Sequence, residues 1–450
     1  MEISGTTSSG LLKFTLAVIT VLLTACSSSR EPEPLTLTVG FTNDMVGNIR
    51  SCGCEVKDYG GIGRRATMIK AVRDTAQNFL LLEGGDFFSE KINYGKEKAE
   101  VTLQAMAVMD YHGVVLGEKD FSFGHDYIRQ RCWEEGLPVL ASNLYDATAD
   151  TLLFPPARAV ELSGGLRVGL IGVISPNLKM PPQLQMGSIR FEDPVQAVRG
   201  QLKSFGEAVD LVVVLAHMSY LDAVALARKV NQIDLLVVGH QGRSTRRDQR
   251  FGNAFILQAP ENGRYMGFAY SVLSDQKKIS TLVSRVEPLD ENYPDDPAVA
   301  NIFAAYDLNI EAAEKSLTRA GNIKTGDGGQ PPYLGAESCR DCHREIYDQW
   351  QETVHARAFD VLVSQSREFD RDCTPCHTTG FDRPGGFVSL TATADLIHVQ
   401  CESCHGNGSE HAASPAQATP ADPAAACLIC HTAGRSPDFV FEEKWRLIQH

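Results

Sequence analysis

One five-residue motif, Cys-x-x-Cys-His, occurs four times in the last quarter of this chain, and no other feature constrains its fold as strongly. Two thiols three residues apart can form thioethers with the two vinyl groups of one haem, and the adjacent imidazole then ligates the iron. The copies begin 34, 28 and 26 residues apart and use every cysteine of the segment, which argues against chance or zinc. The motifs predict four c-type haems attached through Cys339, Cys342, Cys373, Cys376, Cys401, Cys404, Cys427 and Cys430, with His343, His377, His405 and His431 as proximal ligands.

The same segment contains enough histidines to ligate every iron on both sides. Four irons have eight axial positions, and the segment has eight histidines. The four that lie outside the motifs are the candidate distal ligands: His355, His398, His411 and His450.

The sequence around the motifs is specific as well. It includes the run CRDCHREIYDQWQETVHARA, then CTPCHTTGF, VQCESCHGNGSEH and the closing run SPDFVFEEKWRLIQH. In these runs residues 333–450 resemble the multihaem cytochrome c-554 family. The resemblance implies distal roles for His355, His411 and His450, whereas His398 is either the fourth distal ligand or an ordinary surface histidine. Because some members of the family leave one iron five-coordinate, the second alternative would leave one haem open to a small ligand.

The size and charge of this segment indicate how it folds and which partners it binds. A chain of 118 residues buries only a modest side-chain core, so we expect a mainly helical segment that is packed around its haems and does not fold without them. It carries 9 Lys+Arg and 17 Asp+Glu, a balance of −8. That charge favours basic redox partner proteins, such as other cytochromes, and argues against nucleic acid.

Residues 1–25 predict export. Lys13 precedes an apolar run over residues 14–23, which is too short to span a bilayer but suits a signal peptide. The run ends in Leu-Thr-Ala-Cys26, which resembles the bacterial lipobox and implies lipidation of Cys26; a plain signal peptide is the alternative. Lipid on Cys26 would hold the protein to a membrane through the polar tether 26–34. We expect a periplasmic or cell-surface lipoprotein, and Ser27 favours the outer membrane.

Residues 35–289 alternate short β-branched runs with amphipathic stretches, which is typical of an α/β domain. Strands are expected over residues 35–41, 79–83, 114–117, 139–142, 166–174, 211–216 and 235–239. Helices are expected between them, for example over residues 62–74, 99–109, 194–205 and 221–230. A further helix over residues 298–320 and a Gly/Pro-rich linker over 321–332 make up a connecting region, 290–332, before the haem segment.

Five polar side chains each follow one of the predicted strands. Because functional residues of α/β folds lie at the carboxyl ends of strands, we expect these side chains to meet. Carboxylate and imidazole groups together predict a site for a divalent metal ion. The five residues are Asp44, Asp86 in GGD, Glu118 in GEKD, His217 in LAHMS and His240 in VGHQG.

These motifs, together with the runs FSFG from Phe121 and ASN from Ala141, resemble the 5′-nucleotidase branch of the calcineurin-like metallophosphoesterases. The resemblance implies a metallophosphoesterase-like α/β sandwich with two metal positions. One position is damaged here, because Val46 and Gly242 stand where the family has histidines. The other keeps two carboxylates and two imidazoles, a competent set for one Mn, Fe or Zn ion.

The residue at the position of the family's catalytic histidine is Lys119. A lysine there can neutralise a bound oxyanion but is a poor general acid unless its pKa is strongly lowered. Two-metal hydrolysis clamps the attacking and leaving oxygens between two ions, so a site with one ion loses that clamp. We therefore expect hydrolase activity to be weakened, with Lys119 as the remaining catalytic candidate.

Three cysteines lie outside the haem motifs and the lipobox: Cys52, Cys54 and Cys132. The thiolates of Cys52 and Cys54 follow Asp44 closely, so they are candidate ligands at the vacated metal position. A disulfide from one of them to Cys132 is the alternative in an oxidising compartment, and unpaired structural thiols are a third.

The whole chain is thus expected to be a membrane-anchored multihaem cytochrome c that transfers electrons. Its N-terminal domain would bind a partner or hold a remodelled metal centre. The alternatives are a metal-dependent phosphoesterase of the 5′-nucleotidase type and a reductase that acts at an open haem iron.

Overall fold

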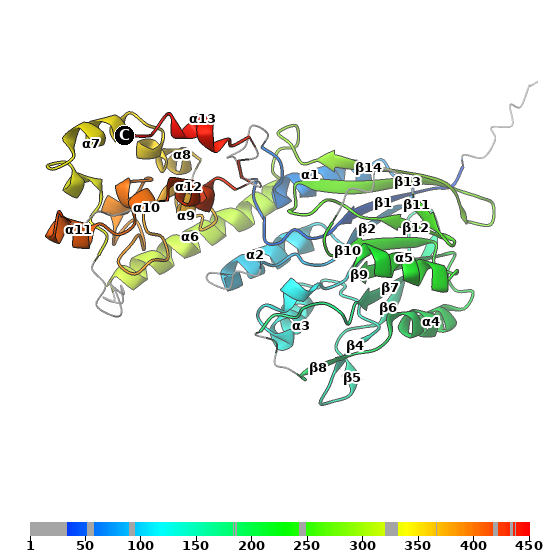
Figure 1. The fold of residues 1–450 in the computed structure, drawn as a ribbon. Coiled ribbons are helices and arrows are strands. Elements are labelled where there is room, and N and C mark those ends of the chain that lie inside the picture. Colours follow the sequence, from blue (N-terminus) through cyan, green and yellow to red (C-terminus); the bar gives the residue numbers. More distant parts are fainter. Residues whose placement is uncertain are drawn as a thin grey trace, which may run out of the picture. The chain divides into compact units, whose positions relative to one another are not determined.

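Two β-sheets and the helices around them make up the first part of the structure, a computed structural model of the chain (Figure 1). The residues that it describes are 34–51, 58–89, 95–182, 184, 187–242, 249–319, 332–365, 367–416, 422–432, 435–436 and 438–450. The predicted signal peptide, Cys26, Cys52 and Cys54 lie outside these residues. In the part of the chain so described, no helix is both long and apolar enough to cross a membrane.

The first sheet has five strands in the order β14-β13-β1-β2-β3. Strand β1 pairs in parallel with β2 and antiparallel with β13, so the sheet is mixed. The strands are β1 (Thr36–Thr42), β2 (Phe79–Glu83), β3 (Gly113–Val114), β13 (Tyr265–Leu273) and β14 (Ile279–Pro288).

The second sheet has six strands in the order β11-β12-β10-β9-β7-β6, and its central strands β7, β9, β10 and β12 are parallel. These strands are β6 (Ala157–Glu161), β7 (Arg167–Ile174), β9 (Leu211–His217), β10 (Leu235–Gly239), β11 (Gln249–Phe251) and β12 (Ala254–Leu257). A small antiparallel sheet has the order β5-β4-β8, with β4 (Leu144–Asp146), β5 (Thr151–Leu152) and β8 (Ile189–Phe191).

Strand β9 shows how the layers pack. Its seven residues are all buried, and successive side chains point to opposite faces of the sheet. Leu211 and Leu215 enter the core that is shared with the first sheet, whereas Val212 and Val214 enter a second core beneath the outer helices. The two sheets therefore form a sandwich, as the α/β prediction requires.

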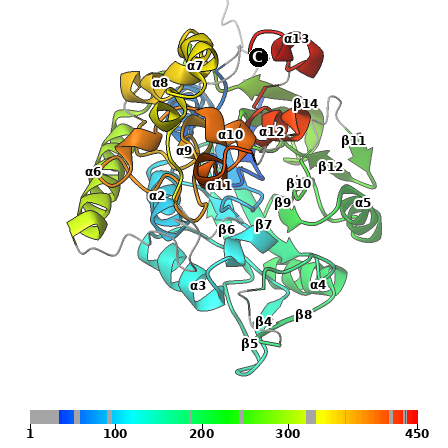
Figure 2. The ribbon, with the colours of Figure 1, turned by 60° about the vertical axis from the view of Figure 1, so that its left-hand side comes forward.

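Five helices belong to this sandwich: α1 (Ile62–Arg73), α2 (Gly95–Val108), α3 (His125–Glu134), α4 (Pro194–Phe205) and α5 (Tyr220–Lys229). Helices α4 and α5 lie along the second sheet (Figure 2). Helix α4 starts where the sequence predicts, because Asp193 accepts a hydrogen bond from Gln196 N and Pro194 occupies the first turn.

The second part of the structure consists of short helices that follow the long helix α6 (Pro297–Arg319). Its α-helices are α7 (Arg344–Gln351), α8 (Asp360–Ser364), α9 (Thr374–His377), α10 (Cys401–His405), α11 (Ser409–Ala413), α12 (Pro423–Cys430) and α13 (Phe441–Trp445). The 3₁₀ turns are η1 (Glu118–Phe121) in the sandwich and, in this segment, η2 (Ala336–Cys339), η3 (His355–Arg357) and η4 (Ala394–Leu396). Residues 35–450 form one compact unit, and domain boundaries at 289 and 332 stay predictions.

One expected strand, over residues 139–142, is wrong. Strand β3 ends at Val114, so Val139 makes only a single parallel bridge to it. The chain then turns toward the second sheet, where Ser142 Oγ donates to Gly172 O at 2.8 Å. Strands β4–β6, β8 and β11–β14 were not predicted from the sequence.

Candidate metal and haem sites

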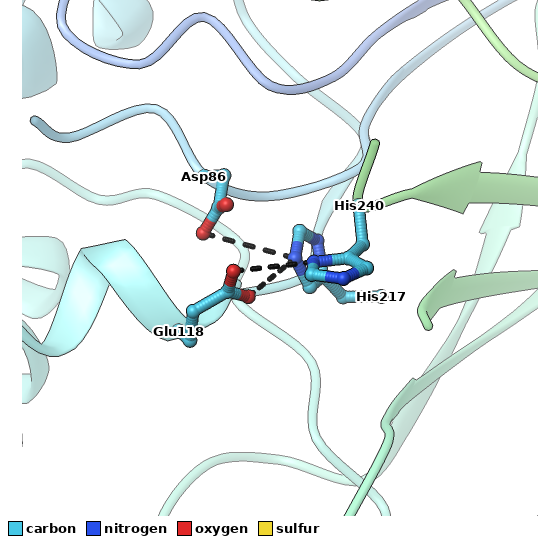
Figure 3. Close-up of side chains that lie close together, drawn as sticks. All are labelled: Asp86, Glu118, His217 and His240. Carbon is cyan, nitrogen blue, oxygen red and sulfur yellow. Dashed lines mark hydrogen bonds and ion pairs between the residues drawn. The ribbon is translucent and has the colours of Figure 1, made fainter. Parts of the chain in front are cut away.

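Four side chains from the carboxyl ends of neighbouring strands converge in the sandwich (Figure 3). Asp86 follows β2, Glu118 opens η1 after β3, His217 ends β9 and His240 follows β10. Each offers one ligand atom, and these atoms all lie within 4.8 Å of one another. We call this group the four-residue cluster.

Hydrogen bonds orient the two imidazoles of the cluster. His217 Nδ1 lies 2.7 Å from Gly84 O, so it donates there and leaves Nε2 facing Glu118 Oε2 at 3.0 Å and Asp86 Oδ1 at 3.7 Å. His240 Nδ1 is buried and has no hydrogen-bond partner, although it lies 3.1 Å from Glu118 Oε1. A buried nitrogen of this kind is costly unless it has a partner, and a metal ion would supply one. The residues therefore fit a divalent ion.

Buried charges in the cluster neutralise one another when no ion is bound. Burial alone would lower the pKa of His217, but Asp86, Glu118 and Asp44 raise it to about 10. Burial alone would raise the pKa of Glu118, but the hydrogen bond from His217 and the nearby charges of His217 and Lys119 hold it well below its usual range. A metal ion would replace the proton of His217, because imidazole ligates as the neutral base.

Lys119 adds a second internal cation. Its Nζ pairs with Asp86 and lies 3.1 Å from Glu118 Oε1, while its backbone N donates to Asp86 Oδ1 at 2.9 Å. Burial opposes the charge of Lys119, but the carboxylates outweigh it and raise its pKa. A lysine held in this state is neither a general base nor a nucleophile.

Asp120 binds the backbone beside the four-residue cluster. It was not among the predicted site residues. It is fully buried, and its Oδ2 accepts hydrogen bonds from Asp86 N and Gly117 N at 2.8 Å each. Its Oδ1 accepts from Phe88 N at 2.9 Å. Asp120 thereby ties the loop after β2 to the loop after β3. The only sequence signal for this role is an acidic residue two positions after Glu118.

The structure does not bring Asp44 into the four-residue cluster. Its Oδ1 accepts from His240 N at 3.2 Å, and its Oδ2 accepts from Asn43 Nδ2 at 2.7 Å. Nearby, a Cβ on Gly242 would lie only 2.4 Å from Ala259 O and 2.6 Å from Asn43 Nδ2. The backbone therefore leaves no room for a side chain at residue 242. A ligand could not be restored there without moving the backbone, at the metal position where Val46 and Gly242 replace the family's histidines.

Cys132 is not part of the four-residue cluster. It is buried in the first core on α3, and burial raises the pKa of its thiol. A buried neutral thiol behaves as a small apolar side chain. Cys132 is a free cysteine in this structure, which does not support the alternative of a disulfide from Cys132 to Cys52 or Cys54.

In the haem segment, three motif histidines each face one histidine from outside the motifs. A metal–imidazole bond is about 2 Å long, so two rings on opposite sides of one iron have centroids roughly 6 Å apart. The centroids are 5.9 Å apart for His343 and His411, 6.3 Å for His431 and His355, and 5.7 Å for His405 and His450. These distances fit one iron between the rings of each pair.

The remaining motif histidine, His377, has a different environment. Its Nδ1 donates to Ala358 O, which leaves Nε2 for an iron. Among the described residues no histidine ring contacts it. His398 instead accepts a hydrogen bond from Phe359 N at its Nδ1, 3.1 Å away, and its Nε2 lies 4.0 Å from Asp360 Oδ1. The structure therefore does not place His398 as the fourth distal ligand.

A cavity of 1440 Å³ adjoins these histidines. Its lining includes residues of the second, third and fourth motifs, namely Cys373, Cys376, His377, Cys404, His405, Cys427, Cys430 and His431. A large space lined by paired cysteines and histidines fits porphyrins.

Comparisons with known proteins separate the same two parts. A family model described as "Cytochrome c554 and c-prime" matches residues 338–406. Cytochrome c-554 of Nitrosomonas europaea is 32% identical over 92 residues, which are 17% of this chain and 39% of that protein. Snake venom 5′-nucleotidase of Naja atra is 26% identical over 58% of this chain and 55% of its own length. The 5′-nucleotidase of Vibrio parahaemolyticus is 28% identical over 56% and 52%, so the chain spans about half of these nucleotidases.

Solved structures agree on the fold of the first part. A 5′-nucleotidase precursor from Thermus thermophilus superposes with a TM-score of 0.53, 22% identity, and coverage of 62% of this chain and 59% of that one. A calcineurin-like phosphoesterase from Bacillus subtilis gives 0.51 and 19%, with coverage of 61% and 98%. The chain joins a 5′-nucleotidase-like metallophosphoesterase domain to a cytochrome c-554-like segment. We refer to these parts as the nucleotidase-like domain and the cytochrome segment.

Proposed function

We propose that this chain is an exported electron-transfer protein that carries four c-type haems, and that its nucleotidase-like domain holds one divalent metal ion. The observation that carries the proposal is the pairing of three motif histidines with three histidines from elsewhere in the cytochrome segment. An iron with histidine on both sides has no position for a substrate, so such haems exchange electrons only.

The surroundings of the haem sites support this role. The second, third and fourth motifs line one cavity, so their haems would lie in one group. The cytochrome segment carries an excess of eight acidic residues, which favours association with basic redox proteins.

Haem content and spin state test the proposal directly. In a host that matures c-type cytochromes, we expect a Soret band, a mass increase of four haems, and electron paramagnetic resonance signals of three low-spin haems and one high-spin haem. The absence of covalent haem would sink the proposal. Four low-spin signals would instead identify a distal ligand for the iron at His377.

The metal ion is supported by the four-residue cluster and by the buried Nδ1 of His240, which makes no hydrogen bond. Two carboxylates and two imidazoles suit Mn, Fe or Zn. We expect one ion per chain in isothermal titration with Mn, and none in Glu118→Gln. An unchanged stoichiometry in that variant would contradict this site.

A metal-dependent phosphoesterase is the second candidate, because the four-residue cluster lies in a metallophosphoesterase fold. Two observations weaken it: both oxygens of Asp44 bind protein groups, and residue 242 has no room for a ligand. Phosphatase and nucleotidase assays with Mn decide the matter. Turnover that Glu118→Gln abolishes would establish a hydrolase, whereas no turnover leaves the electron-transfer role.

A haem-centred reductase is a third candidate, favoured by the absence of a histidine ring against His377 among the described residues. Binding of cyanide to ferric protein tests for an open iron. A single equivalent bound at the high-spin haem is expected.

Export and lipidation are part of the proposal and depend on the sequence of residues 1–34. We expect acyl chains on Cys26 and release of the protein from the outer membrane fraction by Cys26→Ala. A soluble wild-type protein would exclude the anchor.

A further inference from the structure

The loop that leads into the second haem motif lies against the nucleotidase-like domain. Arg367 Nη1 donates to the backbone oxygen of Ser51 at 2.7 Å. Farther along the same loop, Asp372 forms an ion pair with Lys98 of α2. These contacts fall within the single compact unit of residues 35–450, and they fix the backbone directly before Cys373.

Helix α6 fixes the backbone at residues 50–51, which Arg367 of the haem loop contacts. Arg50, next to Ser51, binds Asp307 of α6 with distances of 2.9 and 2.8 Å from its Nη2 to the two carboxylate oxygens. The Arg50 guanidinium also lies over the Phe303 ring, 4.9 Å from its centroid. Arg50 is mostly buried, so this pair is less screened than a surface pair. The backbone at residues 50–51 is therefore a fixed support for the haem loop.

The cavity beside the second motif has a wall from each part of the chain. Cys373, Cys376 and His377 line it from the cytochrome segment. The residues that line it from the nucleotidase-like domain are Asn48, Arg50, Ser51, Tyr59, Asn262 and Arg264. Arg50 is already paired with Asp307, whereas Arg264 supplies a cation of the kind that binds the carboxylate groups of a haem.

A short chain of hydrogen bonds leads from this wall to the four-residue cluster. Asn262 N donates to Asp44 O at 2.7 Å. The carboxylate of Asp44 in turn accepts from His240 N at 3.2 Å, and His240 belongs to the cluster. Asn262 thus lines the haem cavity on one side and supports a neighbour of the metal site on the other.

We propose that the nucleotidase-like domain completes the pocket of the haem bound at Cys373 and Cys376, which makes this haem the electrical contact between the haem group and the metal ion. The proposal rests on the proposed function, because it requires both cofactors. With Fe or Mn bound at the cluster, exchange would move one electron and no atoms: the metal ion would lose one electron as the ferric haem gained it, or the reverse.

Paramagnetic relaxation tests this contact in the full holoprotein. We load the four-residue cluster with Mn, or with diamagnetic Zn as the control, and measure the relaxation of each haem signal. Mn is expected to shorten the relaxation of the high-spin haem at His377 more than that of the three low-spin haems. Equal shortening of all four, or an effect confined to the low-spin haems, would overturn the proposal.

A second measurement does not depend on the metal ion, so it separates failure of the contact from failure of the metal site. In Arg264→Gln the pocket loses a cation, and the reduction potential of the haem at His377 should fall because the ferric form is favoured. The matched control is Arg285→Gln, an exposed residue of β14. A selective fall in Arg264→Gln supports the shared pocket even in protein that binds no Mn. No shift, or the same shift in both variants, would exclude it.

Discussion

The nucleotidase-like domain and the cytochrome segment differ in what fills their interiors. The domain buries side chains on both faces of its central strands, as β9 shows. In the cytochrome segment, the buried apolar cluster consists of Phe359, Leu362 and Cys373. Apolar side chains there remain exposed, including Val354 at 78% and Ile429 at 64%. A protein interior is normally close-packed, so the segment leaves its apolar contacts to the porphyrins.

The same difference appears in the two kinds of site. In the four-residue cluster, opposite charges hold each other in place without an ion. In the cytochrome segment, three pairs of histidine rings face one another at the separation that a bound iron requires. One site is assembled by protein contacts and the other by its cofactor.

The largest expected effect follows from removing haem. Full-length protein made without cytochrome maturation should keep a folded nucleotidase-like domain, whereas residues 333–450 should stay unfolded because their side chains bury too little area. Amide hydrogen exchange would show slow exchange in β9 and β10 and fast exchange throughout α7 to α13. Slow exchange in the haem-free segment would contradict the view that the cytochrome segment depends on haem to fold.

The charges of the metal cluster give the next largest effect. In Glu118→Ala, His217 and His240 lose their buried carboxylate partner, and loss of one member of a buried ion pair costs about 3 to 5 kcal/mol. The loss of unfolding free energy is measured by urea denaturation of the haem-containing protein in the presence of a chelator. Far-ultraviolet circular dichroism monitors the unfolding. Glu207→Ala, at an exposed residue, is the control and should change stability little. A small loss in Glu118→Ala would mean that water already screens this cluster.

Much of the sandwich could be predicted from the sequence because its central strands are continuous apolar runs. Strands β2 and β10 and helix α4 match their predicted ranges, and α4 has a clear start at Asp193 and Pro194. Strands β13 and β14 mix buried and exposed residues, which gives a weaker pattern than a continuous apolar run, and β14 lies at the edge of its sheet. The error at residues 139–142 has a tertiary cause, because β3 is too short to pair with that run.

The sites show the same limit. Their positions after predicted strands were enough to predict that Asp86, Glu118, His217 and His240 meet. The same reasoning could not predict that both carboxylate oxygens of Asp44 accept hydrogen bonds from neighbouring residues. In the cytochrome segment, a count of histidines permits four pairs. Which histidine faces which depends on contacts between distant helices, and a count contains no such information.

A smaller effect concerns pH. Burial raises the pKa of Asp44 to about 6 from its usual 3.8, so the domain gains stability from the protonated carboxyl below pH 3.8 and loses it as pH rises through about 6. In a chelator, wild-type stability should fall by up to about 3 kcal/mol over this window relative to Asp44→Asn, which cannot ionise. Denaturation of both proteins at several pH values measures the difference. Parallel pH profiles would show that Asp44 is ionised throughout.

The internal cation of the metal site predicts a change in affinity. Lys119 pairs with Asp86 and Glu118, so a divalent ion must compete with its ammonium group. Lys119→Gln should bind Mn about tenfold more tightly, which is about 1.4 kcal/mol. Lys179→Gln, at an exposed residue, is the control in the same titration. Weaker binding in Lys119→Gln would mean that Lys119 moves aside and orients the ligands.

The smallest effect is expected where the two regions touch. The ion pair between Lys98 and Asp372 is partly exposed, with Asp372 46% accessible, and such pairs contribute about 0.2 to 1 kcal/mol. A double-mutant cycle with Lys98→Ala and Asp372→Ala in holoprotein should give a coupling energy in that range, and one that decreases with salt. Because this pair lies next to the second haem motif, its coupling should vanish in protein made without haem. A coupling that persists without haem would mean that the loop docks on the nucleotidase-like domain before the cytochrome segment folds. The junction would then be held by protein contacts, like the nucleotidase-like domain, and not by the cofactor.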